Sequence, residues 1–273
     1  MRILLEYCFG HSSSRNLYGH VAASLRRRGM EADVVQSVDG MNVSSYDVLI
    51  SHDFVDRLRI DGGTTRVYGG REMTRPEGLA VIAASGVPVM PWALAANGTE
   101  VVDLFGRWRA QRLLLKRSET CKGDGITVFD RRRVSDLRWN PERDVFCPEL
   151  NESDGDYYKI EIFNGRIILG WVSRNTPLGR GFDGLLVEVR RGYGRRRLIG
   201  YSRPLRIAAQ NLSRALTDRG VGYTSLDLMK DTSGKLVAIE INTAQVGTWW
   251  TARFPWTRWR YSRAVLELIE AAR

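Results

Sequence analysis

The first seventy residues alternate between short apolar segments and one segment with helical spacing. Within residues 16–28, Leu17, Val21 and Leu25 recur every four positions, as on one face of an amphipathic helix. Three other segments are short and apolar, as strands are: 2–8, 31–38 and 46–51. A strand, a helix and two further strands in this order predict a small parallel α/β lobe. Residues 57–70 contain several glycines in an irregular pattern, so we interpret them as a linker.

The middle of the chain has two short helical segments, followed by a strand, a polar loop and a returning strand. Helices are expected at 76–85 and 99–108. The strand at 112–117 is apolar until it ends in Lys116 and Arg117, and the returning strand covers 126–129. This order predicts an antiparallel pair of strands with two cationic side chains where the loop begins.

The loop between these two strands contains Gly123 and Gly125. A strand, a glycine loop and a returning strand can fold over phosphate groups, because the backbone N–H groups and Lys116 supply positive charge. The glycine spacing matches neither the P-loop nor the dinucleotide-binding fingerprint. Taken alone the loop is therefore a weak indication, since many glycine hairpins bind nothing.

An Asn-Gly pair at residues 164 and 165 is a strong short-range hairpin signal. It joins two apolar strands, 157–163 and 166–173. Lys159 lies on the first of these strands, and Arg174 directly follows the second. The pattern thus predicts a hairpin that presents two cationic side chains.

Further strands and helices follow around this hairpin. A short strand at 144–150 carries Glu149 and Leu150 at its end. Another hairpin, with the basic tip Arg190–Arg197, is made by two strands, 185–190 and 198–201. Helices are expected at 206–219 and 263–272. Separate runs of strands and helices give the C-terminal part an α+β character.

The last expected hairpin places three oxygen-bearing side chains together. Its strands are 226–230 and 235–242. Because side chains alternate along a strand, Glu240 and Asn242 share a face, and Asp227 on the partner strand can join them. Two carboxylates and an amide oxygen suit Mg²⁺, which often lies between one or two carboxylates and substrate phosphates. A solvated strand end is the alternative interpretation.

The composition is that of an ordinary globular protein without a membrane segment. The chain has 273 residues, of which 43% are hydrophobic and 26% charged. No apolar run approaches the roughly 18 residues of a membrane span. We expect no signal peptide, because Glu6 interrupts the first apolar run after a few residues. The three cysteines, Cys8, Cys121 and Cys147, are widely spaced, so we expect a reducing cytoplasm.

The charge balance adds a question about partners. The formal net charge is +10, and a basic surface attracts nucleic acid, nucleotides or acidic peptides. The tip Arg190–Arg197 is either a solvated hairpin end or an arm that recruits a polyanionic partner. Four tryptophans near the C-terminus are expected in the core, with the wall of a substrate pocket as the alternative: Trp249, Trp250, Trp256 and Trp259.

The order of these features resembles the ATP-grasp superfamily, and most closely the carboxylate–amine ligases that include D-alanine–D-alanine ligase and the ribosomal-protein glutamate ligases. The likeness is clear over residues 74–250 and weaker before them. It implies an ATP-grasp fold with an N-terminal α/β domain over 1–70 and an ATP-grasp domain over 71–273. Within the latter, a small lid lobe is expected at about 110–148 and a C-terminal lobe at about 149–273.

The resemblance also implies a role for each matching residue. The implied ATP-binding positions are Arg75, Lys116, Gly123, Gly125, Glu149, Leu150 and Lys159. The implied Mg²⁺ ligands are Asp227, Glu240 and Asn242. Arg174 would face the γ-phosphate as a catalytic residue, and Lys159 would anchor the nucleotide or the substrate.

The activity implied is an ATP- and Mg²⁺-dependent ligase that joins a carboxylate to an amine through an acylphosphate and releases ADP and phosphate. Its partners would be small-molecule or peptide substrates, and the protein would be a monomer or a homo-oligomer. Two alternatives remain: an ATP-grasp phosphotransferase or other non-ligase enzyme, and a nucleic-acid-binding protein with a secondary nucleotide site. No residue is identified as the base that deprotonates the amine.

Three departures from the family pattern limit what the resemblance implies. Arg75 stands where the family often has a lysine, and Arg117 where it has a proline. Residues 244–247, Ala-Gln-Val-Gly, replace a Ser-Pro-Gly segment that often shapes the substrate pocket. The substrates are therefore not implied by the resemblance.

Overall fold

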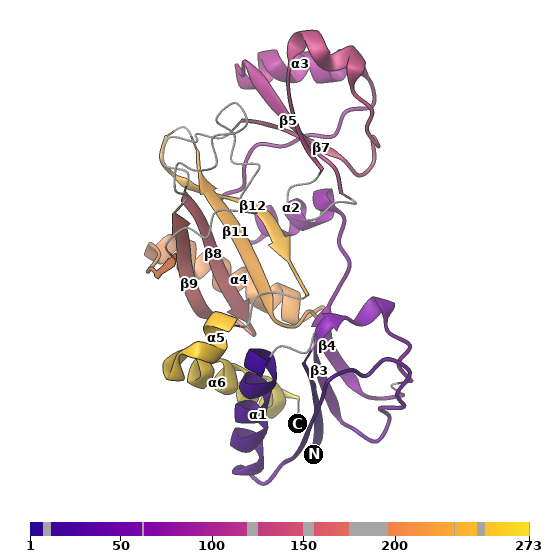
Figure 1. Cartoon of the computed structure of the whole chain (residues 1–273), viewed down its shortest axis with the longest axis vertical. Helices are drawn as coiled ribbons and strands as arrows, with labels where there is room; N and C mark the ends of the chain where they lie inside the picture. The colour runs from indigo at the N-terminus through magenta and orange to yellow at the C-terminus, as the bar shows by residue number, and fades with distance from the viewer. Residues whose placement is uncertain are drawn as a thin grey trace.

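The computed structural model describes residues 1–7, 12–61, 63–118, 125–149, 156–174, 196–231, 233–244 and 249–272. Within these ranges the strands form three sheets that follow one another along the length of the molecule (Figure 1). The four N-terminal strands lie at one end, a three-stranded sheet lies at the other, and a five-stranded sheet lies between them. The expected mixture of a parallel α/β part and antiparallel sheets is confirmed.

The N-terminal sheet is parallel throughout. Its strands are β1 (Arg2–Glu6), β2 (Glu31–Val35), β3 (Val48–Phe54) and β4 (Arg66–Gly70), in the order β2-β1-β3-β4. The helix α1 (Ser12–Arg26) follows β1 and buries Leu17, Val21 and Leu25, so the predicted apolar stripe is confirmed. The small parallel lobe expected from the sequence is present.

The interpretation of residues 57–70 as a linker is wrong, because their last part is β4. After the short 3-10 helix η1 (Val55–Arg57), the chain returns to the sheet beside β3. The glycines that made this stretch look irregular are required by close packing. A Cβ atom on Gly70 would lie 2.2 Å from the Cβ of Ala244 and 2.8 Å from the carbonyl oxygen of Asp53. Glycine at this point therefore lets β4 approach the segment that follows Asn242.

The small sheet at the far end is antiparallel and has a core of its own on one face. Two helices precede it, α2 (Arg75–Ala84) and α3 (Gly98–Trp108). Its strands are β5 (Arg112–Lys116), β6 (Ile126–Asp130) and β7 (Val145–Pro148), in the order β6-β5-β7, with the 3-10 helix η2 (Arg131–Asp136) after β6. Phe129 packs edge to face against both Phe105 and Phe146. These apolar contacts hold α3 on the sheet.

The central sheet is antiparallel and contains both hairpins expected to carry the site. Its strands are β8 (Asp156–Phe163), β9 (Arg166–Arg174), β10 (Arg196–Leu198), β11 (Thr224–Lys230) and β12 (Leu236–Asn242), in the order β10-β9-β8-β11-β12. Asn164 and Gly165 have positive φ angles of 43° and 69°, as the predicted tight turn requires. The expected strand 185–190 lies outside the described residues, and β10 ends at Leu198 rather than continuing to residue 201.

Helix α4 (Arg203–Thr217) covers one face of the central sheet. It begins three residues before the expected start, because Pro204 fits the first turn of a helix. Ile160 and Ile162 of β8 belong to the same buried cluster as Leu205 and Leu212 of α4. Residues 159 and 161 therefore point to the opposite face of the sheet.

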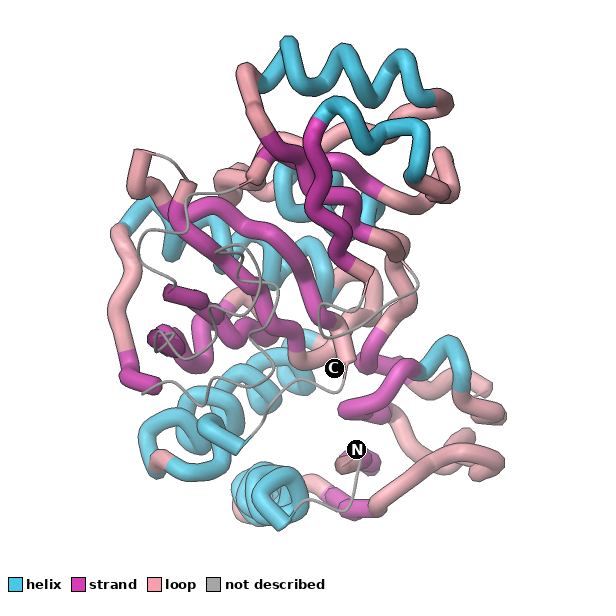
Figure 2. The backbone as a smooth tube through the Cα atoms, turned by 45° about the horizontal axis from the view of Figure 1, so that its top comes forward, coloured by secondary structure: helices cyan, strands magenta, loops and turns pink. Residues whose placement is uncertain are grey.

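The C-terminal helices lie between the central sheet and α1 (Figures 1 and 2). They are α5 (Trp249–Arg253) and α6 (Pro255–Ala271), so α6 begins eight residues before the expected helix 263–272. Tyr261 and Val265 of α6 are buried in one cluster with Leu17 and other residues of α1. Within the described residues, no helix is both long and apolar enough to cross a membrane.

The four tryptophans of this region do not all lie in the core. Trp256 and Trp259 are 40% and 57% exposed. The expectation that these two are core residues is wrong, because the helical period of α6 turns them to its outer face. The side chains of Trp249 and Trp250 lie outside the described part of the structure.

Candidate active site

Cross-strand pairing places side chains from four strands of the central sheet in one row. Asp227 on β11 pairs with Glu240 on β12 and with Lys159 on β8. Lys159 in turn pairs with Trp171 on β9. Directly opposed residues of adjacent strands have side chains on the same face, about 5 Å apart. The row lies on the face opposite α4.

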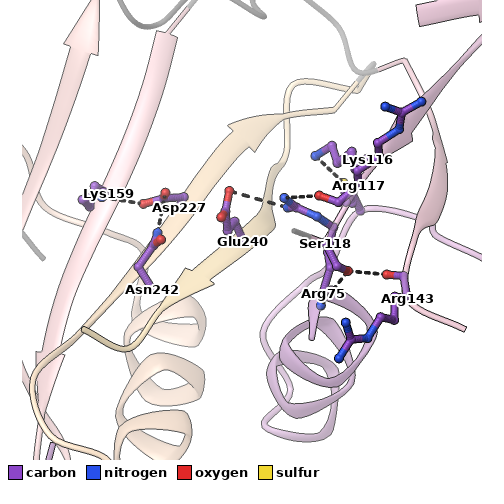
Figure 3. A network of polar contacts seen from close by, with 10 residues as sticks. Arg75, Lys116, Arg117, Ser118, Arg143, Lys159, Asp227, Glu240 and Asn242 are labelled. Atoms are coloured by element: carbon purple, nitrogen blue, oxygen red, sulfur yellow. Dashed lines mark hydrogen bonds and ion pairs between the residues drawn. The ribbon is translucent and has the colours of Figure 1, made fainter. Parts of the chain in front are cut away.

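Asp227 is held by two neighbours (Figure 3). Its Oδ1 lies 3.0 Å from the Nζ of Lys159, and its Oδ2 accepts a 2.9 Å hydrogen bond from the Nδ2 of Asn242. Burial by itself would lower the pKa of the Lys159 ammonium, but the carboxylates of Asp227 and Glu161 raise it overall. Lys159 therefore remains charged and balances the buried Asp227.

The three oxygen-bearing residues of the last hairpin come together, although the strand is not regular. The pairing shifts between Asp227 and Leu228, which pair with Glu240 and Ala238, so that Ile239 has no partner on β11. Such a bulge breaks the alternation that the sequence pattern assumed, and bulges often re-aim side chains beside functional sites. Here Glu240 still lies on the side of Asp227 (Figure 3).

Arg75 joins the central sheet to the small sheet. It is the first residue of α2, where Thr74 and Glu77 form a capping box that fixes the helix start. Its Nη1 lies 3.6 Å from the Oε2 of Glu240, and its Nη2 donates to the carbonyl oxygen of Arg117 at 3.4 Å (Figure 3). The buried Nε of Arg75 has no hydrogen-bond partner in the part of the chain that the structure describes. An oxygen-rich anion would supply that missing acceptor.

Lys116 is a buried cation at the end of β5. Only 4% of it is exposed, and its Nζ donates to the Sδ of Met90 at 3.4 Å. Burial lowers the pKa of this ammonium group, and no ion pair holds it among the described residues. A buried cation without a carboxylate partner is costly unless an anion binds beside it. Lys116 therefore fits a phosphate-binding role.

A small cavity of about 70 Å³ opens beside these groups, lined by Arg75, Ser118 and Glu240 among others. Ser118 lies where the loop after β5 begins. Two hydrogen bonds hold it there: its N–H donates to the Oδ1 of Asp144 at 2.9 Å, and its hydroxyl donates to the carbonyl oxygen of Arg143. Sequence reasoning missed Ser118 and Asp144. No local signal identifies them, since they lie 26 residues apart and meet only in the fold.

The other residues expected at the site have different partners or lie outside the described residues. Glu149 forms a bidentate ion pair with Arg112, with distances of 2.7 and 2.6 Å. Gly125 accepts a hydrogen bond from the N–H of Arg117 at 3.0 Å and thereby extends the pairing of β5 and β6. Gly123, Leu150, the side chain of Arg174 and the basic tip up to residue 195 lie outside the described residues.

Two further polar residues on the same face escaped sequence reasoning. Glu161 lies two positions after Lys159, and Ser225 lies two positions before Asp227; both are fully buried. The alternation of side chains along a strand was the signal that could have identified them, because residues two positions apart share a face. Burial raises the pKa of the Glu161 carboxyl to about 7, partly opposed by the charge of Lys159.

The donor set at the hairpin suits Mg²⁺. The buried Oδ1 of Asp227 has an ion pair but lacks a hydrogen bond, and Glu240 and Asn242 add a carboxylate and an amide oxygen beside it. No group of three or more His, Cys, Asp or Glu side chains suited to a metal occurs within the described ranges. Two carboxylates and an amide leave coordination positions for phosphate oxygens and water, which is the usual arrangement for Mg²⁺ beside a nucleotide. These residues can therefore hold the ion together with a bound phosphate.

Comparison with known proteins gives matches at the level of structure. No protein-family model and no curated protein matches the sequence. The ATP-grasp ligase PsnB, solved with a minimal precursor, has a TM-score of 0.64 at 14% identity, covering 98% of this chain and 99% of that chain. The D-cycloserine synthetase DcsG has a TM-score of 0.60 at 15% identity, with coverage of 98% and 99%.

A third structure extends the comparison to the branch named by the sequence resemblance. The D-alanine–D-alanine ligase from Bacillus anthracis, complexed with ATP, has a TM-score of 0.57 at 15% identity and covers 100% of this chain and 96% of that chain. The coverage includes the N-terminal lobe, where the sequence resemblance was weak. The chain therefore has the ATP-grasp fold over its full length.

Proposed function

We propose that the protein is an ATP- and Mg²⁺-dependent ligase that joins a carboxylate to an amine. One observation carries the proposal: the guanidinium of Arg75 lies between Glu240 of the central sheet and the end of β5 in the small sheet. Two cations, Arg75 and Lys116, thus lie beside a pair of carboxylates at the junction of two sheets. Triphosphate and Mg²⁺ together carry the complementary pattern of charge. The fold supports the same conclusion.

The cations of the site would bind the nucleotide. Lys116 would contact the α- and β-phosphates with Arg75, whose planar head offers several N–H donors. Gly123 and Gly125 would close over the phosphates and keep water from the reacting group. Glu149 and Leu150 would contact the adenine and ribose.

The carboxylates would hold the metal. Asp227, Glu240 and Asn242 would bind Mg²⁺, which neutralises phosphate charge when it is bound. Lys159 lies beside Asp227 and would keep a positive charge near the transferring phosphoryl group. Arg174 would face the γ-phosphate from the end of β9. Among the similar structures, PsnB was solved in a complex that contains Mg and ADP, which supports this assignment.

The reaction would proceed in two steps. A carboxylate oxygen of the first substrate attacks the γ-phosphorus, the bond to the ADP oxygen breaks, and an acylphosphate forms. The nitrogen of an amine then attacks the acyl carbon, phosphate leaves, and the nitrogen loses its proton. The protein's contribution to both steps is to orient the reactants and to stabilise charge on the phosphoryl oxygens.

The substrates would be a small-molecule or peptide carboxylate and an amine. One similar structure is a D-alanine–D-alanine ligase and another was solved with a precursor, so the fold alone does not restrict the size of the substrate. The direct test is ADP release by the purified protein against pools of amino acids, peptides and polyamines, followed by mass spectrometry. A condensed product supports the proposal. A phosphorylated product without incorporated amine would instead identify a phosphotransferase.

A further inference from the structure

A second row of side chains lies next to the row that contains Asp227. Glu161 on β8 pairs with Ser225 on β11, and Ser225 pairs with Asn242 on β12. Each residue of this row lies two positions from a residue of the first row, so the two rows share a face about 7 Å apart. The second row therefore borders the site proposed for phosphoryl transfer.

The middle of this second row contains polar atoms without partners. Glu161 and Ser225 are both 0% exposed. Within the described parts of the chain, neither the Oε2 of Glu161 nor the Oγ of Ser225 has a hydrogen-bond partner. The other oxygen of Glu161 accepts a long bond of 3.5 Å from the Nε1 of Trp171, and the nearby hydroxyl of Tyr223 is bonded to the hydroxyl of Thr251 at 2.6 Å. Buried polar atoms normally have hydrogen-bond partners, so two adjacent side chains that each have an unbonded oxygen indicate a missing ligand.

The charge of the row specifies the class of that ligand. Lys159, the nearest cation, is committed to Asp227 at 3.0 Å, and no ion pair involves Glu161 among the described residues. A group that satisfies the Oε2 of an ionised Glu161 must donate a hydrogen bond, and a primary ammonium with three N–H donors does so and also supplies the opposite charge. The Ser225 hydroxyl can accept one of these bonds.

We propose that Glu161 and Ser225 form the subsite that receives the ammonium group of the amine substrate. This inference rests on the proposed ligase function and names what that function left open, the place where the second substrate binds. An ammonium held here lies one row from Asp227, close to where the acylphosphate would form. Glu161 is thus a binding and specificity residue on the strand that also carries Lys159.

The test measures cation binding without turnover. Ethylammonium chloride serves as the probe, and tetramethylammonium chloride at equal concentration serves as a cation of the same charge without N–H donors. We expect ethylammonium to raise the thermal unfolding midpoint of the full chain above the value in tetramethylammonium. In Glu161→Gln the apparent affinity for ethylammonium should fall about tenfold or more, since a charge-assisted hydrogen bond is lost.

Three further variants complete the design. Glu161→Asp should retain weakened ethylammonium binding. Ser225→Ala should weaken it while leaving the unfolding midpoint without probe nearly unchanged, since its hydroxyl bonds to no described residue. Glu31→Gln, at an exposed glutamate of β2 in the N-terminal sheet, should behave as the unaltered chain. If Glu161→Gln does not fold, Ser225→Ala decides: full retention of the ethylammonium response in that variant would overturn the proposal.

The same measurements separate this inference from the ligase proposal. Equal stabilisation by ethylammonium and tetramethylammonium, or an unchanged response in Glu161→Gln, overturns the subsite even if amide products are detected. Selective ethylammonium binding that depends on Glu161 supports the subsite even if no amine releases ADP, a result that would overturn only the ligase.

Discussion

Opposite charges at the sheet face occur as two pairs, and the pairs differ in burial. Asp227 and Lys159 are both largely buried. In the second pair Arg75 is largely buried as well, whereas the Glu240 side chain, 3.6 Å away, is 41% exposed. Removing one member of a buried pair destabilises a fold strongly, but removing an exposed member has a small effect. Glu240 is therefore the residue at which the proposed metal role can be tested without loss of the fold.

We expect Glu240→Ala to reduce Mg²⁺-dependent ADP release by about a hundredfold or more, since a ligand that stabilises transferring phosphoryl charge is lost. Far-ultraviolet circular dichroism should be unchanged, because the side chain is partly exposed and belongs to no apolar cluster. Glu31→Ala, at an exposed glutamate of β2 in the N-terminal sheet, should retain full activity. Unchanged ADP release in Glu240→Ala would exclude the proposed mechanism.

Glu161 gives the protein a pH-dependent stability with a definite sign. The pKa of its carboxyl is raised from an ordinary 4.5 to about 7, chiefly by burial. Between these two pH values the folded state therefore keeps a proton that the unfolded state has lost. Stability must then fall as pH rises from 4.5 to 7 and level off above that. We expect Glu161→Gln to abolish this loss, which amounts to about 3 kcal/mol by pH 8. Urea unfolding of both proteins at several pH values measures the difference.

A control for this pH effect has the opposite sign. Arg166 holds the pKa of the Glu267 carboxyl below its usual value. Its contribution is present above pH 4.5 and is lost as the pH falls through the lowered pKa. Glu267→Gln should therefore lose stability at neutral pH and approach the unaltered chain in acid. A Glu161→Gln profile that runs parallel to the unaltered chain between pH 4.5 and 7 would contradict the raised pKa.

At the scale of elements, β4 shows how a contact between distant segments overrides a local pattern. Gly69 and Gly70 resemble loop residues in sequence, yet Gly69 bonds to the backbone of Gly220 and Gly222, and Gly70 meets Ala244. The glycines are needed because the N-terminal sheet docks there against the segment after β12. No local rule gives this information, since the partners lie in the last quarter of the chain.

Substitution of two glycines by alanine should have opposite effects on stability. Gly70→Ala would place a Cβ 2.2 Å from that of Ala244, so the strand must shift, at a cost of about 1–3 kcal/mol. A Cβ added to Gly19 in α1 would meet no atom within 4 Å, so Gly19→Ala should stabilise the protein by about 0.5–1 kcal/mol. Urea unfolding measures both changes. Similar destabilisation by the two substitutions would contradict the packing described for β4.

Elements with strong local signals were predictable, and those fixed by long-range packing were not. The Asn164-Gly165 turn follows from backbone conformation alone, and α3 begins where the Asn97 side chain caps its first turn. The bulge at Ile239 depends on pairing with a separate strand, whereas the early start of α6 has a local signal that was missed, Pro255 in the first turn of the helix. The same division applies to the site. Lys116, Asp227 and Glu240 could be predicted because they follow the order of motifs along the chain. Glu161 and Ser118 could not, because only cross-strand pairing and loop contacts place them at the site.

At the scale of the whole molecule, the proposed nucleotide site is assembled from separate parts. Lys116 comes from the small sheet, Arg75 from the helix between the sheets, and Glu240 from the central sheet (Figure 3). Apart from these polar groups, the two sheets also share apolar packing, since Leu114 of β5 belongs to the same buried cluster as Ile239 of β12. Arg75 adds a polar link between the sheets, since it contacts both Glu240 and the carbonyl oxygen of Arg117. A bound nucleotide that contacts Lys116, Arg75 and Glu240 would strengthen this coupling.

This coupling is measurable by amide hydrogen exchange. We expect Mg²⁺ and ATP together to slow exchange in both β5–β6 and β11–β12, because one ligand stabilises both strand pairs. The strands β1 and β2, at the other end of the molecule, should exchange equally with and without the ligand and serve as an internal control. Glu240→Ala should remove the protection from both strand pairs at once. Protection confined to β11–β12, or retained in β5–β6 of the variant, would show that the nucleotide does not bridge the two sheets.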